Sequence, residues 1–327
     1  PTLASEQAPH DECRRAALDL AWCLLGLELM AIKTIVVGTD LGESGRRATL
    51  LAVQTARATS ATLWLVHASE VGLEHAWRDL PLGARSAAHA LRQRLKGRFE
   101  NSLQELENER KECEAAGLSC QTSCEEGAPW ETILRTAVSV NADLIAVGDP
   151  IGSIGLPERL LGSTSERVVR QAPCSVLVSC GRIRDDYQGA RIAVGVDFST
   201  HGIEAVRWAR DIASAVGGDV TLLHVVPHPI TETVLPTEWP SVLEGLASAA
   251  RSRLEQLVVS EGLKADTELR VLDGSVGKMI CNATAEVGAD LLLVGCRGQG
   301  RLRGMMLGSS SQYCLRYSPV PVVAVRP

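Results

Sequence analysis

Two kinds of segment alternate along the chain. Short runs that are apolar almost throughout, such as Thr34–Gly38 and Leu291–Gly295, alternate with longer segments whose apolar residues recur at helical spacing, such as Thr200–Val216. The first kind predicts strands that are buried on both faces, and the second predicts helices that cover them. This alternation favours a parallel sheet with a layer of helices on each face.

The second half of the chain shows the pattern most clearly. Its strands are expected at residues 191–196, 220–226, 268–272, 291–295 and 320–325. Its helices are expected at residues 200–216, 242–259 and 276–287, with a last one that begins near Ser309. Because crossovers between parallel strands are right-handed, this order predicts a doubly wound α/β domain.

The chain also repeats itself. Residues 35–67 align with residues 192–224 at a constant offset of 157, with 11 of 33 positions identical. Such a repeat predicts two homologous doubly wound, Rossmann-like domains in tandem. We expect the domains at residues 31–181 and 190–327, a linker at 182–189, and an N-terminal extension at 1–30 that lies outside the fold.

Composition narrows the class of protein. The 327 residues suffice for about two domains, and 45% hydrophobic with 22% charged residues is ordinary for a globular chain. A net charge of -6 and only 3% aromatic residues argue against nucleic acid and against a membrane surface as partners. The ten cysteines contain no C-x-x-C pair, which favours reduced thiols and a cytoplasmic location.

A glycine-rich segment carries the candidate chemistry. Residues 295–298 (G-C-R-G) follow a predicted strand, and Gly308-Ser309 opens the next helix. In a doubly wound sheet a ligand binds beyond the strand ends at this point, and the N-terminus of a helix favours a phosphate. Ser309 and Ser310 can donate to phosphate oxygens, and Asp197 at the end of the first strand can accept from a ribose hydroxyl. Together they indicate an adenine nucleotide.

The full spacing G-x-x-G-x9-G-S, after the run 289–294, resembles the ATP-binding loop of the universal stress protein family. The resemblance spans both halves, since Gly38-Thr39-Asp40 and Gly195-Val196-Asp197 are similar to the family's opening strand. It implies ATP as the ligand and contact between adenine and the backbone of Val225. The residues by themselves leave ATP, AMP and a cyclic nucleotide open, because a glycine loop recognises phosphate more than the number of phosphates. In an ATPase that used this pocket, Asp197 could help hold Mg²⁺. The residues implied in the second half are Gly195, Asp197, Val225, Val294, Gly295, Arg297, Gly298, Gly308, Ser309 and Ser310.

The first half departs from this spacing. It places one residue more between Gly148 and Gly152, where Asp149 adds negative charge and Pro150 removes a backbone donor. The corresponding nucleotide site consists of Asp40, Gly148, Gly152, Gly162 and Ser163. The altered loop leaves open whether the first half binds the nucleotide, and it is the feature that favours a scaffold with empty pockets.

Simpler roles compete for several of these residues. Asp40 and Asp197 can cap the helices that follow them, and Arg297 can be a solvated loop charge. His67 and His224 end apolar strands, where a hydrogen-bonded structural imidazole is commoner than a catalytic one.

Three functions remain at this point. The first is a regulatory module that holds ATP and presents a surface to a protein partner yet to be identified. The second is a slow ATPase or phosphotransferase that uses the same pocket, and the third is a nucleotide-free scaffold. The last strands, at residues 174–178 and 319–325, are apolar and are expected at sheet edges. In similar proteins the last strand mediates dimerisation, so we expect the two domains to pair through these strands and a homodimer to use them as well.

Overall fold

The computed structural model describes residues 32–69, 85–149, 162–227, 239–297 and 307–327. The extension at residues 1–30 and two predicted site residues, Gly152 and Gly298, lie outside the described residues.

The first half alternates strands and helices as its apolar runs predict. Its elements, in chain order, are β1 Thr34–Gly38, α2 Glu43–Thr59, β2 Thr62–Ser69, α3 Arg85–Ala115, β3 Cys120–Glu126, α4 Pro129–Ser139, β4 Leu144–Val147, α5 Ser163–Gln171 and β5 Ser175–Val178. The second half repeats this order with β6 Arg191–Gly195, α6 Thr200–Val216, β7 Asp219–Val226, α7 Trp239–Ser260, β8 Glu268–Asp273, α8 Val276–Glu286, β9 Leu291–Gly295, α9 Ser309–Tyr317 and β10 Val322–Val325.

Most of the predicted bounds agree with these elements to within a few residues. α6 and β9 begin and end where the sequence places them, because Ser199 caps α6 and Gly217, with a φ of 64°, ends it. β10 begins at Val322, two residues later than expected. Pro321 precedes it and has no N–H to donate to a neighbouring strand.

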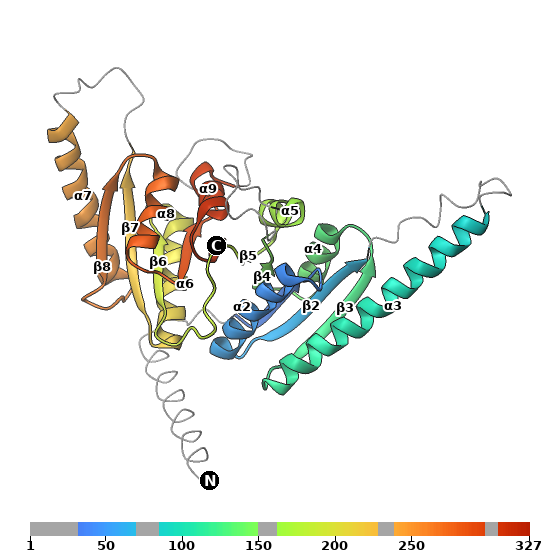
Figure 1. The fold of residues 1–327 in the computed structure, drawn as a ribbon. Helices are drawn as coiled ribbons and strands as arrows, with labels where there is room; N and C mark the ends of the chain where they lie inside the picture. The colour runs from blue at the N-terminus through green and yellow to red at the C-terminus, as the bar shows by residue number, and fades with distance from the viewer. Residues whose placement is uncertain (1–31, 70–84, 150–161, 228–238, 298–306) are drawn as a thin grey trace, which may run out of the picture. The chain divides into compact units, whose positions relative to one another are not determined.

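The strands form one ten-stranded sheet with the order β3-β2-β1-β4-β5-β10-β9-β6-β7-β8 (Figure 1). Strands are parallel within each half, as in β1–β4 and β6–β9, and the two halves meet where β5 and β10 pair antiparallel. Each half is therefore a doubly wound α/β domain, as expected. The order reverses between β1 and β4 in the first half and between β6 and β9 in the second, which fixes where a ligand can enter.

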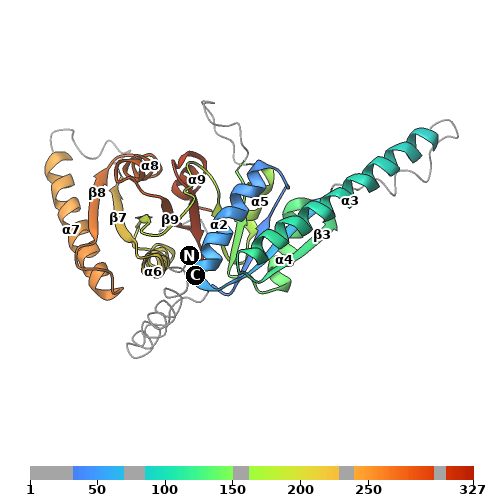
Figure 2. The ribbon, with the colours of Figure 1, turned by 60° about the horizontal axis from the view of Figure 1, so that its bottom comes forward.

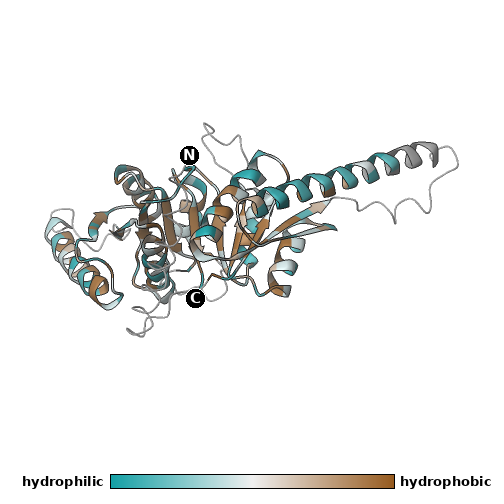
Figure 3. Cartoon of the chain, turned by 90° about the horizontal axis from the view of Figure 1, so that it is seen from below, coloured by the Kyte–Doolittle hydropathy of each residue, from teal (hydrophilic) through white to brown (hydrophobic). Residues whose placement is uncertain are grey.

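Helices cover both faces of this sheet. Right-handed crossovers place α2 and α3 on one face of the first half and α4 and α5 on the other. α3 packs against β3 and β2, α7 packs against β8 and β7, and α4 lies against α5 (Figure 2). The inner strands, such as β4, β5 and β10, are apolar and buried, as predicted, whereas the edge strands β3 and β8 carry polar residues. The helix α3 presents a largely hydrophilic surface (Figure 3).

The structure does not place the last strand of each half at a sheet edge, where the sequence predicts it. β5 and β10 pair with each other, Val323 opposite Leu177, and each also has a parallel neighbour, β4 or β9. They therefore lie in the middle of the sheet, and its edges are β3 and β8. The two halves therefore pair through their last strands, as expected, and both backbone edges of β5 and of β10 are occupied within the chain.

The linker is held by both halves. Gln54 of α2 donates to the carbonyl of Arg184 at 3.3 Å and accepts from the N–H of Tyr187 at 3.1 Å. The Arg184 guanidinium lies 2.7 Å from the carboxylate of Asp290, which also accepts the N–H of Arg191 at 3.0 Å. These contacts fix the chain between the domains in place.

Within the described residues, none of the helices is both long and apolar enough to cross a membrane.

Candidate functional site

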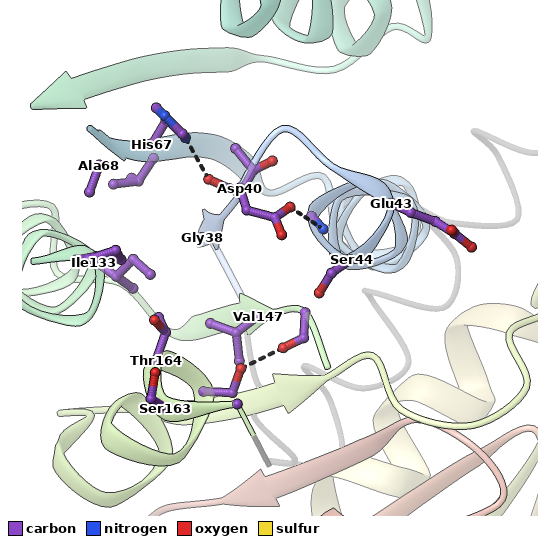
Figure 4. Close-up of a pocket in the computed structure, with 17 residues that line it drawn as sticks. Gly38, Asp40, Glu43, Ser44, His67, Ala68, Ile133, Val147, Ser163 and Thr164 are labelled. Atoms are coloured by element: carbon purple, nitrogen blue, oxygen red, sulfur yellow. Dashed lines mark hydrogen bonds between the residues drawn. The ribbon is translucent and has the colours of Figure 1, made fainter. Parts of the chain in front are cut away.

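A cavity of about 660 Å³ opens at the carboxyl ends of β1 and β4, the point where the strand order of the first half reverses (Figure 4). Four of the predicted site residues line it together: Asp40, Gly148, Gly162 and Ser163. Asp40 and Gly148 follow two neighbouring strands, and Gly162-Ser163 begins α5. The fold thus brings residues that are more than 120 positions apart in the sequence, such as Asp40 and Ser163, to the same cavity.

Asp40 holds the start of α2. Its Oδ1 atom accepts the N–H groups of Gly42 and Gly45, each at 2.9 Å. A Cβ atom on Gly45 would lie 2.4 Å from the hydroxyl oxygen of Thr39, so this position requires glycine. The capping role weighed from the sequence is therefore present at Asp40, whose carboxylate also lines the cavity.

His67 and His224 take the same place in the two halves. The Nδ1 atom of His67 lies 3.0 Å from the carbonyl oxygen of Thr39, and that of His224 lies 2.8 Å from the carbonyl oxygen of Val196. Each imidazole ties the second strand to the turn after the first strand. Both histidines are hydrogen-bonded, as the structural interpretation expects.

The sequence did not single out one pair of serines that shape the site. The hydroxyl of Ser165 donates to the carbonyl of Gly148, and the hydroxyl of Ser311 donates to that of Gly295 at 2.6 Å. Each bond joins the first turn of a helix to the end of the preceding strand. A detectable signal was the repeated run of hydroxyl residues at positions 163–165 and 309–311.

In the second half the end of β9 and the start of α9 form a corner, equivalent to the one between β4 and α5 in the first half. Gly195 of β6 lies opposite Val294 of β9, which places both strand ends side by side. The N–H of Gly308 donates to the carbonyl of Cys296 at 2.9 Å, so the start of α9 lies directly beside the end of β9. Among the described residues no side chain caps α9. Its first N–H groups, from Ser309 and Ser310, have no partner within the helix and can meet an anion.

Asp197 and Arg297 approach the same serine. The hydroxyl of Ser199 lies 2.6 Å from the Oδ1 atom of Asp197 and 3.3 Å from the carbonyl oxygen of Arg297, and it accepts the N–H of Gly202 at 3.1 Å. In this half Ser199, and not Asp197, caps the helix. Arg297 is exposed beside this corner, which leaves its cation accessible to a ligand.

Two titratable groups near this corner have shifted pKa values. Burial lowers the pKa of His201, and the nearby Arg297 and Arg326 lower it further. Burial also raises the pKa of the Cys296 thiol. Both shifts favour the neutral form of the group concerned.

The adenine contact proposed at Val225 corresponds by the offset of 157 to Ala68 in the first half. Ala68 lines the first-half cavity, and Val225 occupies the matching register on β7, opposite Leu272 of β8. The structure therefore places Val225 on the strand next to β6, along the same edge as Gly195.

The chain is similar to proteins of one known family. The model of the universal stress protein family matches residues 31–179 and 190–326. The chain belongs to the universal stress protein family. A universal stress protein of Mycobacterium tuberculosis is 28% identical over 309 residues, which cover 89% of this chain and 99% of the relative. Another from the same organism is 31% identical over 228 residues, covering 65% and 72%.

The solved structure of a universal stress protein shows the same fold. It comes from Archaeoglobus fulgidus, has a TM-score of 0.65 at 22% identity and covers 90% of this chain and 98% of its own. A structure of a universal stress protein in complex with cAMP is 28% identical, covers 45% of this chain and 96% of its own, and has a TM-score of 0.32.

Proposed function

We propose that this universal stress protein binds ATP as a regulatory ligand at the mouth of its second half. The observation that carries the proposal is the uncapped start of α9, fixed beside the end of β9 by the bond from Gly308 to Cys296. The free N–H groups there, the hydroxyls of Ser309 and Ser310, and the cation of Arg297 are the donors that bind phosphate best. Asp197 lies at the neighbouring strand end, where a ribose or a magnesium ion of Mg-ATP would be held.

A regulatory role, in place of turnover, follows from the same groups. They can bind phosphates, and the imidazole of His224, which lies near the end of β7, is already engaged with the carbonyl of Val196. Bound ATP would stabilise the folded chain and alter the surface offered to a protein partner. At a concentration about 100 times its Kd, a ligand specific for the folded state adds roughly 2.7 kcal/mol of stability. We place this function in the cytoplasm, where thiols such as the free Cys296 and Cys314 stay reduced.

The substitution Gly308→Val tests the site. The backbone at Gly308, with φ -70° and ψ 150°, is open to a β-branched residue, so the fold should persist while the added side chain obstructs the approach of phosphate. We expect isothermal titration to show at least a tenfold loss of ATP affinity. Gly245→Val, on α7 where a Cβ atom meets nothing within 4 Å, is the matched control. Unchanged ATP binding by the Gly308 variant would contradict the site.

Incubation with labelled ATP tests the role. A regulatory ligand is recovered intact from the purified protein, and mass spectrometry of released small molecules identifies it as ATP, AMP or a cyclic nucleotide. Steady release of ADP would instead support the slow ATPase.

A further inference from the structure

The helix α3 is longer than the strands on which it packs. It has 31 residues and is about 46 Å long, whereas its neighbour β3 has 7 residues and spans about 23 Å. Its C-terminal part lies against β3 and β2, and its N-terminal part extends beyond them (Figures 1 and 2). The sheet therefore covers only one part of this helix.

An apolar stripe continues along α3 beyond the part that the sheet buries. Leu106 and Cys113 lie in the part that packs on the strands, and they are 1% and 3% exposed. Leu103 and Phe99 precede Leu106 by three and seven positions, so they lie on the same face of the helix. Leu103 is nevertheless 43% exposed, and none of the described side chains at residues 93–105 is buried. We call residues 93–105 the projecting part of α3.

The charges of α3 are separated along its length. Residues 85–98 contain five Lys or Arg and no acidic residue, whereas residues 99–115 contain six Glu and two Lys or Arg. Arg94 and Arg98 are exposed in the first of these segments, and Glu100 is exposed in the second. The helix is therefore basic in its N-terminal half and acidic in its C-terminal half, and the sign changes within the projecting part.

This order of charges does not stabilise the helix itself. The start of a helix carries a partial positive charge and its end a partial negative charge, so acidic residues are favoured first and basic residues last. The helix α3 has the opposite order. Pairs within the helix offset part of the cost, as between Lys96 and Glu100 at 3.8 Å and between Arg110 and Glu107 at 2.7 Å. A partner with the complementary order of charges would offset more of it.

We propose that two copies of this chain form a homodimer by antiparallel pairing of the projecting parts of α3. In this orientation the basic segment of each helix lies along the acidic segment of the other, and the two apolar stripes cover each other. A polyanion would suit only the basic segment, because the glutamates of the other segment would repel it. The dimer does not depend on the proposed function, since α3 contributes none of the described residues that line the first-half cavity.

Symmetry determines which residues meet in such a dimer. The sign of the charges changes between Arg98 and Glu100, which places the two-fold axis near Phe99. Arg98 of each copy then lies opposite Glu100 of the second copy, and Arg94 lies beside Glu105 of the second copy. Exposed ion pairs contribute little affinity each, but they determine the orientation of the helices and select the partner. The affinity comes mainly from the apolar stripe.

Sedimentation equilibrium of the full chain tests the pairing. We expect the wild type to have twice the mass of one 34.9 kDa chain, and the fraction of dimer to fall in high salt. Arg94→Glu with Arg98→Glu should weaken the dimer at least tenfold, because like charges then face each other.

A second pair of substitutions tests the antiparallel orientation. Glu100→Arg with Glu105→Arg should weaken the dimer as strongly as the reversal of the two arginines. An equimolar mixture of the two double variants should dimerise again, because each basic segment then faces an acidic one in both contacts of the symmetric pair. A parallel pair of helices would align like charges in the mixture only in part and in the wild type throughout, so it predicts no wild-type dimer.

Arg251→Glu, a charge reversal at an exposed residue of α7, is the control and should leave the dimer unchanged. Circular dichroism shows that each variant keeps its helices. A wild-type chain that is monomeric at high micromolar concentration would overturn the proposal. A dimer that persists in both double variants would also overturn it and would indicate an edge strand, β3 or β8, as the interface. A mixture of folded variants that stays monomeric would contradict the antiparallel pairing.

Discussion

Different side chains accept the N–H groups at the start of α2 in the first half and of α6 in the second half. Asp40 accepts helix N–H groups itself, whereas Asp197 binds Ser199, which in turn accepts the N–H of Gly202. The sequence predicts a cap at this place, because Asp and Ser are both preferred there. It could not decide which side chain fills the role, since Gly42 replaces Ser199 in the first half and only the folded turn shows which oxygen reaches the amide.

His201 provides a test at the scale of one residue. Burial, with Arg297 and Arg326, lowers the pKa of its imidazole below the usual value. The folded state then binds fewer protons than the unfolded state, so the stability that depends on neutral His201 is present above about pH 6.5 and is lost as the pH falls. We expect an NMR titration to show this lowered pKa, and bound ATP to raise it because phosphate offsets Arg297.

The substitution His201→Gln assigns the resonance, and Arg297→Gln should raise the pKa of His201 without ligand. A pKa at or above the usual value in the wild-type chain, or one that ignores both ATP and Arg297, would contradict this description of the corner.

At the scale of helices and strands, the ends that are marked by nearby residues could be predicted from the sequence. The hydrogen bonds between residues far apart in the sequence could not. α6 matches its predicted bounds because a capping serine and a left-handed glycine mark its ends. The hydroxyl bonds from Ser165 and Ser311 to strand-end carbonyls join residues 17 and 16 positions apart, across loops of different spacing. The repeat indicated the glycines of the site, but only the packing of α5 and α9 against their strands shows what holds those glycines in place.

The bond from Ser311 to Gly295 can be tested at the scale of the strand and helix that it joins. Ser311 is buried, so Ser311→Ala leaves the carbonyl of Gly295 without this donor and should cost about 1–2 kcal/mol of unfolding free energy. It should also weaken ATP binding, because α9 is then held less firmly beside β9. Urea denaturation and titration measure the two effects.

Ser139→Ala is the control for this prediction, since its hydroxyl bonds within α4 to the carbonyl of Thr136 and the residue is exposed. Equal losses in the two variants would show that the bond has no special role.

At the scale of the whole molecule, the linker contacts were the least predictable feature. The sequence marks residues 182–189 as a charged, glycine-bounded segment, which is typical of a linker. It gives no sign that Arg184 pairs with Asp290, a carboxylate more than 100 positions away that is only 6% exposed. Asp143, its counterpart in the first half, accepts the N–H groups of Lys33 and Thr34 instead. The linker therefore reuses an acceptor that the repeat already contained.

Removing this ion pair should weaken the chain as a whole. Arg184→Ala leaves the buried Asp290 with Arg182 at 3.5 Å and with the N–H of Arg191, so we expect a loss of about 1–2 kcal/mol. Calorimetry should show a lower Tm than for the control Arg251→Ala, which breaks an exposed pair with Glu255 on α7. Indistinguishable Tm values would mean that the linker pairing contributes nothing to stability.

The antiparallel pairing of β5 with β10 also determines from which margin of the sheet a ligand or partner can approach each half. Every strand of one half runs against every strand of the other, so the openings beyond β1 and β4 and beyond β6 and β9 face opposite margins of the sheet. A bulky partner seated over one opening would leave the opposite one accessible to small molecules. Two partners could thus bind to the same molecule simultaneously, one at each margin of the sheet.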